Sequence, residues 1–359
     1  MQGSPTLTLR RMKTTRSADP YAGAGYSGMS GRVDGETVRL FSRTRASEGS
    51  EMKKRIESNT SRTAQLTCLS RACSAMETNP YYKSDDDVAL LLLPGVLKAA
   101  IRFSPARKLF ARVFAPKGIY EYVIARTKYI DAAFKQALSE QFDQILIFGA
   151  GFDTRALRFQ ESISGTTIFE LDVPFTQQAK INQYHTRQLS IPGNVTFIPI
   201  DFDRESLSEH LDNAGVRRGV KSLFILEGVI MYLHPESVDL AFRTIRKYGG
   251  TGSRIVFDAV YASVLRKEGK EYGEKGIVKT VTDAGEQWIF GIEKGCVNRF
   301  LGRYEMRLVD KKDTEEIEHE YFCTPDGTIT GRINGTHFLV TAEYGPAAVS
   351  GKEVPDVMK

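Results

Sequence analysis

The middle of the chain reads Gln144-Ile-Leu-Ile-Phe-Gly-Ala-Gly-Phe-Asp-Thr-Arg155. Its apolar start, residues 144–148, predicts a short buried strand. Gly149 and Gly151 follow at the predicted strand-to-helix turn, where a backbone without Cβ atoms allows a ligand to approach closely. A dinucleotide fingerprint would have a third glycine in the place of Thr154. The stretch therefore predicts a nucleotide-type ligand site, but it does not identify the ligand.

Strand-like and helix-like segments alternate along the chain after this turn. The predicted strands are residues 144–148, 167–171, 195–200, 222–227, 254–260, 304–310 and 337–344. A long amphipathic helix is predicted before them, over residues 118–140, with Arg126 on its apolar face. Such alternation is typical of βαβ units. We expect an α/β fold: a doubly wound, mainly parallel, seven-stranded Rossmann-like sheet with helices on both faces.

Helical patterns also precede this core. Residues 58–117 carry spaced apolar side chains, interrupted by Asn79-Pro80 and by Asp85-Asp86-Asp87. They predict an N-terminal helical lid over a Rossmann-like core at residues 118–347. A helix is also predicted to begin at Pro235, after His234, and to end before Gly249-Gly250.

Acidic residues end three successive predicted strands after the glycine turn. Glu170 and Asp172 end the second strand, Asp201 and Phe202 follow the third, and Glu227 ends the fourth. An acid at the second strand is placed to accept hydrogen bonds from a ribose, and an acid beside an aromatic ring suits an adenine. This spacing fits both NAD and S-adenosylmethionine. Three acids favour a positively charged sulfonium ligand over an anionic pyrophosphate.

Six short segments follow one another in the order and at the spacing of one known family. They are Asn59-Thr-Ser-Arg-Thr-Ala64, Arg126-Thr-Lys-Tyr-Ile-Asp131, Gly149-Ala-Gly-Phe-Asp-Thr-Arg155, Glu170-Leu-Asp-Val-Pro174 with Lys180, Asp201-Phe202, and Glu227-Gly-Val-Ile-Met-Tyr-Leu233. Together they resemble the leucine carboxyl methyltransferase-like group of class I S-adenosylmethionine-dependent methyltransferases. The resemblance runs from about residue 58 to residue 345.

The resemblance implies S-adenosyl-L-methionine as cofactor and a role for each residue of the site. Arg126 would hold the cofactor carboxylate, and Gly149 and Gly151 would contact its methionine portion. Asp172, with Glu170 close to it, would hold the ribose. Asp201 and Phe202 would contact the adenine, and Glu227 would line the junction with the acceptor. The implied reaction is O-methylation of a carboxylate or hydroxyl on a small molecule or a peptide C-terminus. It needs no metal, and no catalytic residue is assigned.

Other interpretations of these residues stay open. Arg126 could instead pair with Asp131 or another buried acid, and only one of Glu170 and Asp172 need contact the ribose. Asp153 and Thr154 are more typical of a helix N-cap than of ligand contacts. The five histidines show no metal-ligand spacing, so we expect surface or capping roles for them.

Two other classes of protein compete with a methyltransferase. An NAD-linked oxidoreductase would need the third glycine and a catalytic Tyr-x-x-x-Lys or His that the sequence does not place. A non-catalytic adenosine-binding protein would need only the pocket.

Composition limits the partners and the compartment. Residues 1–55 hold eleven Lys/Arg and five Asp/Glu, so the chain's net charge of +5 comes from a basic tail, predicted disordered over residues 1–57, with a flexible end at 348–359. The charge therefore does not indicate nucleic-acid binding. Four scattered cysteines, no signal-peptide pattern and no spanning run predict a cytoplasmic protein with reduced thiols and no membrane partner. The oligomeric state is not predicted.

Overall fold

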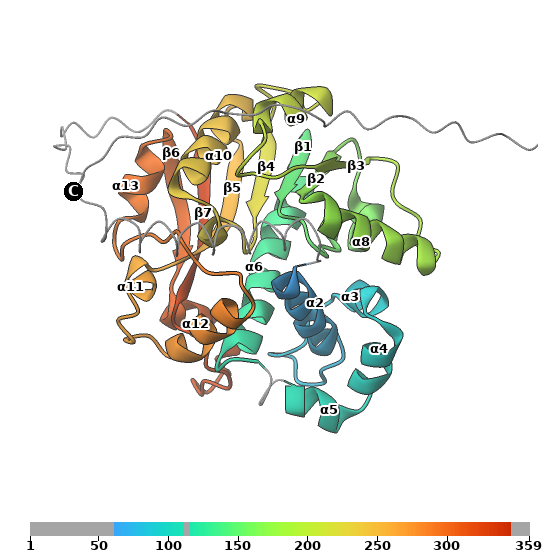
Figure 1. Ribbon diagram of the computed structural model, residues 1–359, viewed down its shortest axis with the longest axis vertical. Helices are drawn as coiled ribbons and strands as arrows, with labels where there is room; N and C mark the ends of the chain where they lie inside the picture. Colours follow the sequence, from blue (N-terminus) through green and yellow to red (C-terminus); the bar gives the residue numbers. More distant parts are fainter. Residues whose placement is uncertain (1–60, 111–114, 346–359) are drawn as a thin grey trace, which may run out of the picture. The chain divides into compact units, whose positions relative to one another are not determined.

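One seven-stranded sheet organises the part of the chain that the computed structural model describes, residues 61–110 and 115–345 (Figure 1). Its strands are β1 (Gln144–Phe148), β2 (Thr167–Asp172), β3 (Val195–Pro199), β4 (Ser222–Leu226), β5 (Arg254–Val260), β6 (Met306–Lys312) and β7 (His337–Tyr344). The predicted tail and flexible C-terminus lie outside the described residues. All seven predicted strands are present, with ends that differ by up to two residues.

The strand order is β3-β2-β1-β4-β5-β7-β6. Strands β1 to β5 pair in parallel, and β7 pairs antiparallel with both β5 and β6. The chain leaves β1 toward β2 on one side and later returns to β4 on the other side. Ligands bind at the carboxyl ends of strands where the strand order reverses in this way. The fold class predicted from the sequence is confirmed.

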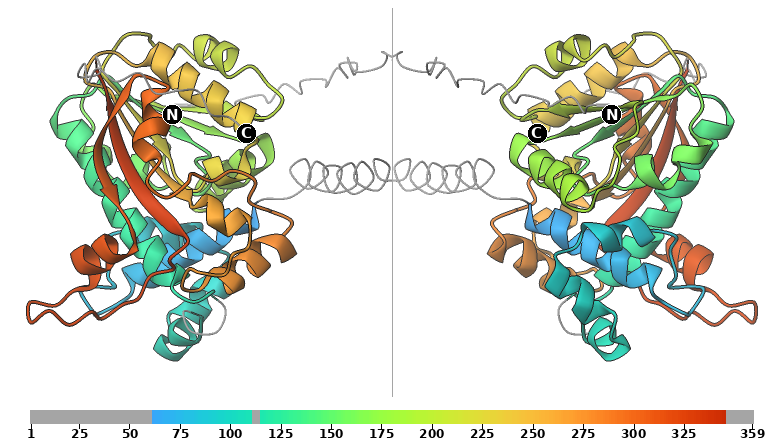
Figure 2. Two further views of the ribbon diagram at one scale, coloured as in Figure 1. Left: turned by 90° about the vertical axis from the view of Figure 1, so that its left-hand side faces the viewer. Right: turned by 90° about the vertical axis from the view of Figure 1, so that its right-hand side faces the viewer.

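Helices cover both faces of the sheet. One face carries α6 (Ile119–Ser139), α7 (Arg155–Arg158) and α8 (Pro174–Thr186); the other carries α9 (Leu207–Asn213), α10 (Pro235–Tyr248) and α13 (Val297–Gly302). Figure 2 shows α6 on one side of the sheet and α10 and α13 on the other. Further short elements are α11 (Ala262–Leu265), α12 (Glu274–Asp283), α14 (Thr314–Phe322) and the 3-10 turns Gln160–Ser162 and Ile230–Tyr232.

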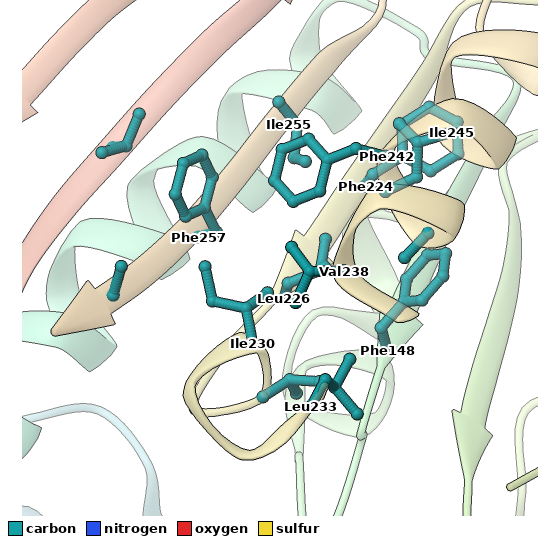
Figure 3. Close-up of a cluster of buried hydrophobic side chains, with 14 of the residues drawn as sticks. Phe148, Phe224, Leu226, Ile230, Leu233, Val238, Phe242, Ile245, Ile255 and Phe257 are labelled. Carbon is teal, nitrogen blue, oxygen red and sulfur yellow. The ribbon is translucent and has the colours of Figure 1, made fainter. Parts of the chain in front are cut away.

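Two hydrophobic cores follow from the alternation of side chains along the strands. Leu146 and Phe148 of β1 face one core, whereas Ile145 and Ile147 face the other. In the first core, the ring of Phe242 on α10 packs edge-on against that of Phe257, with ring centroids 5.5 Å apart (Figure 3). Burial of one such side chain contributes about 1.5–3 kcal/mol, so both faces of the sheet hold the strand ends in fixed positions.

The described residues of the predicted helical region before the core, 61–110 and 115–117, form four helices. They are α2 (Arg62–Ala75), α3 (Asp87–Leu92), α4 (Gly95–Ile101) and α5 (Ser104–Leu109). Helix α2 begins after Ser61, whose hydroxyl accepts a hydrogen bond of 3.1 Å from the backbone of Ala64. These helices lie beyond the carboxyl ends of the parallel strands (Figure 1). No helix among the described residues is long and apolar enough to cross a membrane.

Candidate functional site

A cavity of about 330 Å³ lies at the carboxyl ends of the parallel strands. Its wall contains the segments that follow β1 to β4, together with residues of α2, α6 and α12 and the first residue of β7. Small-molecule sites typically occupy about 300–1,000 Å³. The cavity therefore lies where the strand order predicts a ligand and has the size of a small-molecule site.

Seven of the eight residues predicted to contact the cofactor lie in this wall. They are Arg126, Gly149, Gly151, Asp172, Asp201, Phe202 and Glu227. Glu170 is buried outside it. Six of these seven residues come from four separate strand ends, and Arg126 comes from a helix, so the fold brings them together. Their individual contacts with a ligand stay predictions.

The glycine turn is held by Asp172 at the end of β2. Gly149 and Gly151 have φ angles of +60° and +49°, a region that side-chain-bearing residues rarely adopt. A Cβ atom on Gly149 would lie 2.5 Å from a methyl group of Val229. The carboxylate of Asp172 accepts hydrogen bonds from the backbone N–H groups of Gly151 and, at 2.7 Å, of Val173. Burial nevertheless raises the pKa of Asp172 to about 6.

Glu170 has a different environment although it lies only two residues away on the same strand. Its carboxylate forms a buried ion pair of 2.5 Å with Lys180 on α8. Burial raises the pKa of Glu170 to about 7 despite this ammonium group. Of the two acids that the sequence offers for the ribose, the structure places only Asp172 in the cavity wall.

Arg126 connects two carboxylates of the sheet edge. Its guanidinium lies 3.0 Å from the carboxylate of Glu227 and 2.9 Å from that of Asp258, which is completely buried. Asp258 also accepts hydrogen bonds from the Tyr122 hydroxyl and from the backbone of Gly228. The expected alternative partner, Asp131, is not bonded to Arg126. The other alternative, pairing with a different buried acid, is the one observed.

Asp131 belongs to a second network, around Arg155. Arg155 is almost fully buried and forms ion pairs with Asp131, Asp153 and Glu227, and Arg158 forms another with Asp131. Asp153 also accepts a hydrogen bond of 2.7 Å from the backbone of Arg155, whereas the N-cap residue of α7 is Thr154, whose side chain forms no capping bond. Glu227 is therefore shared by Arg126 and Arg155, and these cations lower its pKa against the opposing effect of burial.

The described cavity wall carries more acids than bases. Its acids are Asp153, Asp172, Asp201, Asp203, Glu227 and Glu286, and its bases are Arg62, Arg71 and Arg126. Such a wall favours a cationic ligand over an anionic one. Phe202, half-buried, stacks on Phe148 with ring centroids 5.9 Å apart and so offers a fixed aromatic surface next to Asp201.

Residues that the sequence did not single out complete the far side of the cavity. Trp288 and His337 are buried in this wall, although we expected surface or capping roles for the histidines. His337 is buried because β7 begins at the carboxyl edge of the sheet, antiparallel to β5, and places its first side chain inward. Its position as the first residue of a predicted strand was the available signal. Tyr232 also lines the cavity.

Glu286 closes the cavity from the side of α2. Its carboxylate accepts hydrogen bonds from the backbone N–H groups of Arg62 and Thr63, at 3.1 and 3.2 Å, and from the hydroxyls of Ser61 and Thr63. The first N–H groups of a helix have no acceptor within the helix. Glu286 supplies that acceptor and thereby ties the start of α2 to the segment after α12.

Comparison with known proteins relates the sequence to one family. The model of the leucine carboxyl methyltransferase family matches residues 64–246. YktD of Bacillus subtilis, provisionally named an S-adenosyl-L-methionine-dependent methyltransferase, is 31% identical over 163 residues, which cover 45% of this chain and 53% of YktD. A protein of Mycolicibacterium smegmatis with the same provisional name is 28% identical over 212 residues, 57% of this chain and 65% of the relative. The chain thus spans between about half and two thirds of these relatives' lengths.

Solved structures show the same fold. A provisionally named methyltransferase from Thermobifida fusca superposes with a TM-score of 0.50 at 17% identity, over 67% of this chain and 89% of that one. A DUF574 family protein from Streptomyces avermitilis has a TM-score of 0.52 at 13% identity, over 81% of this chain and all of the other.

Proposed function

Because the chain belongs to the leucine carboxyl methyltransferase family, we propose that it is an S-adenosyl-L-methionine-dependent methyltransferase that methylates an oxygen atom. The observation that carries this proposal is the acid-rich cavity at the carboxyl edge of the sheet, whose wall contains seven of the predicted contact residues. The provisional names of the relatives from Bacillus subtilis and Mycolicibacterium smegmatis support it.

The residues present fit this cofactor. The positive-φ turn at Gly149 and Gly151 exposes backbone to the cavity, and Asp172 lies beside it in the wall. Asp201 and the fixed ring of Phe202 suit an adenine, and the excess of acids suits a sulfonium and an ammonium group. Arg126 would hold the carboxylate from its position between Glu227 and Asp258. When bound, the cofactor supplies an activated methyl group.

The chain's own contribution is positioning. Rigid placement of two reacting groups gives effective molarities of about 10⁵–10⁸ M in favourable cases. The strand ends fix one side of the cavity, and α2, tied to Glu286, would cover another and exclude water. Glu227 would face the acceptor junction from between its two arginine partners.

Calorimetry separates this proposal from its competitors. We expect S-adenosylmethionine and S-adenosylhomocysteine to bind to the purified full chain and NAD not to bind. Transfer of a labelled methyl group, screened over metabolite and peptide pools, then tests catalysis. Binding of NAD alone would identify an oxidoreductase-type site and reject the proposal. Cofactor binding without transfer to any pool would instead support an adenosine-binding protein.

A further inference from the structure

His337 is presented to the cavity by a rigid frame of aromatic rings. Its imidazole stacks on Tyr122 with ring centroids 4.4 Å apart, and Trp288 lies perpendicular to it at 5.0 Å. Tyr122 and Trp288 line the same cavity, and the apolar residues Ile119 of α6 and Ile277 of α12 belong to its wall as well. The imidazole thus lies between aromatic rings in the cavity wall.

A chain of hydrogen bonds fixes which nitrogen of His337 carries the proton. The amide nitrogen of Asn334 donates to the carbonyl of Lys117 at 2.9 Å, so its oxygen must be the atom that accepts from the backbone N–H of Thr336. That same oxygen accepts from the Thr336 hydroxyl at 2.5 Å. The hydroxyl has only one proton, which is used in this bond.

The remaining bond of the Thr336 hydroxyl, 2.7 Å to Nδ1 of His337, must therefore be donated by Nδ1–H. The neutral ring then carries a bare lone pair on Nε2. No hydrogen-bond partner for Nε2 is found among the described residues. An acceptor atom of a residue in the cavity wall can receive a hydrogen bond from a ligand that carries a donor.

The residues that form this chain of hydrogen bonds are buried. Asn334 and Thr336 are completely buried, and the backbone N–H of Asn334 donates to the carbonyl of Gly118 at 2.9 Å. The sequence Asn334-Gly-Thr336 matches a glycosylation pattern, but in the folded protein its asparagine cannot carry a glycan. Its role here is to orient His337, as a second residue orients a catalytic histidine in other enzymes.

The charged groups near this part of the cavity are already paired with one another. The nearest arginine in the wall, Arg126, already lies between the two carboxylates of Glu227 and Asp258. Glu227 is also paired with Arg155, so the two arginines and two carboxylates balance and supply no surplus positive charge for a carboxylate acceptor. The lone pair of Nε2 repels a carboxylate oxygen, whereas it attracts the proton of a hydroxyl group.

We propose that the methyl acceptor is an apolar molecule with a neutral hydroxyl group, a phenol or an alcohol, whose O–H donates to Nε2 of His337. The proposal rests on the methyltransferase function proposed above and assigns its substrate class. In the reaction, the acceptor oxygen forms its bond to the methyl carbon as the sulfur–methyl bond breaks. The bonding pair stays on sulfur, and the hydroxyl proton passes to Nε2 and then to solvent.

The pKa of His337 is compatible with this role. Burial, with a further contribution from Arg126, lowers it to about 3, so the resting ring is neutral. The proton of an oxygen that is gaining a methyl group is far more acidic than an imidazolium, so this weak base can still accept it. The resulting imidazolium returns its proton to water readily, which restores the bare Nε2.

A matched pair of probes tests the substrate class by binding. The full chain is saturated with S-adenosylhomocysteine and titrated by calorimetry with 4-propylphenol and with 4-propylbenzoate, which share their apolar part. We expect the phenol to bind at least about tenfold more tightly than the benzoate. Equal affinity, tighter binding of the benzoate, or binding of neither overturns the proposal. If S-adenosylhomocysteine itself fails to bind, the proposed function fails first and the inference falls with it.

A variant and a spectrum test the role of His337 itself. His337→Asn keeps a donor toward Thr336 but removes Nε2, so phenol affinity should fall about tenfold while S-adenosylhomocysteine affinity stays within about twofold. Unchanged phenol affinity overturns the proposal. Should that variant fail to fold, ¹⁵N spectra of histidine-labelled wild-type protein decide: the unprotonated Nε2 signal must be present and must shift when the phenol is added. Its absence, or no shift on phenol binding, overturns the assignment.

Discussion

Arg126 and Asp258 form an ion pair of 2.9 Å directly behind the cavity wall, and Asp258 is fully buried. Asp258 also binds the hydroxyl of Tyr122 and the backbone of Gly228. The pair therefore joins helix α6 to the turn after β4. Arg126 serves the structure of the site in addition to the contact with a cofactor carboxylate that we propose for it.

Removal of Arg126 should destabilise the protein strongly. Arg126→Met leaves the carboxylate of Asp258 buried without its cation, a situation that typically costs about 3–5 kcal/mol. The double variant Arg126→Met/Asp258→Asn should recover part of this loss. Urea unfolding measures both. Arg243→Met, which breaks an exposed pair with Asp239, serves as control and should cost less than about 1 kcal/mol. A double variant as unstable as the single one would contradict the argument.

Asp172 should dominate the ribose contact. Asp172→Ala is expected to weaken S-adenosylhomocysteine binding by at least tenfold, about 1.4 kcal/mol, because the variant loses both a ligand contact and the acceptor that holds the N–H of Gly151. Calorimetry at constant temperature measures the change.

The matched control removes the neighbouring buried pair as a unit. Glu170→Gln combined with Lys180→Met leaves no buried charge unpaired and changes no residue of the cavity wall. Affinity for S-adenosylhomocysteine should stay within about twofold of wild type. A loss in this control equal to that of Asp172→Ala would return the ribose contact to Glu170.

The sequence predicts the strands, and which residues lie at the carboxyl edge of the sheet, better than it predicts which side chains form ion pairs. The glycine turn and the acids at Asp172, Asp201 and Glu227 could be placed together because parallel strands end at one edge. Glu170 and Asp172 share a face of β2 by their spacing, yet Lys180 on α8 pairs with only one of them. That difference depends on how a helix packs on the sheet, which local patterns do not encode.

Local sequence patterns did not predict the partners of Glu286 and His337, for a related reason. Each is far along the chain from its partners: Glu286 bonds to Thr63, more than two hundred residues away, and His337 stacks on Tyr122. Neither lies in a motif of a recognisable kind. Only the antiparallel return of β7 to the sheet edge brings His337 to the cavity.

Glu286 should control the order of the start of α2. In Glu286→Ala the backbone N–H groups of Arg62 and Thr63 lose their acceptor, so their hydrogen exchange should accelerate at least about tenfold. Exchange measured by NMR or mass spectrometry tests this, with β1 as internal reference. Glu293→Ala, which removes an exposed partner of Arg266, is the matched control and should leave α2 unchanged. Equal protection of α2 in both variants would show that Glu286 does not hold it.

His337 should make the protein less stable as the pH falls through the mildly acidic range. Its pKa is lowered from 6.5 to about 3 by burial and by Arg126, with Tyr122, Trp288 and the Nδ1 acceptor Thr336 as its other neighbours. Below about pH 6.5 the imidazole of His337 binds a proton in the unfolded chain but stays neutral in the folded protein. The free energy of unfolding therefore decreases with falling pH, by up to about 1.4 kcal/mol per pH unit.

A difference measurement isolates this contribution from that of the carboxylates. His337→Asn cannot titrate, so the stability of wild type relative to this variant should drop by about 2 kcal/mol between pH 7.5 and pH 5. Urea unfolding at each pH provides both values, and the raised pKa values of Asp172 and Glu170 cancel because the two proteins share those residues. A difference independent of pH would mean that the folded protein protonates His337 as readily as the unfolded chain does. The bare Nε2 on which acceptor selection depends would then be absent at mildly acidic pH.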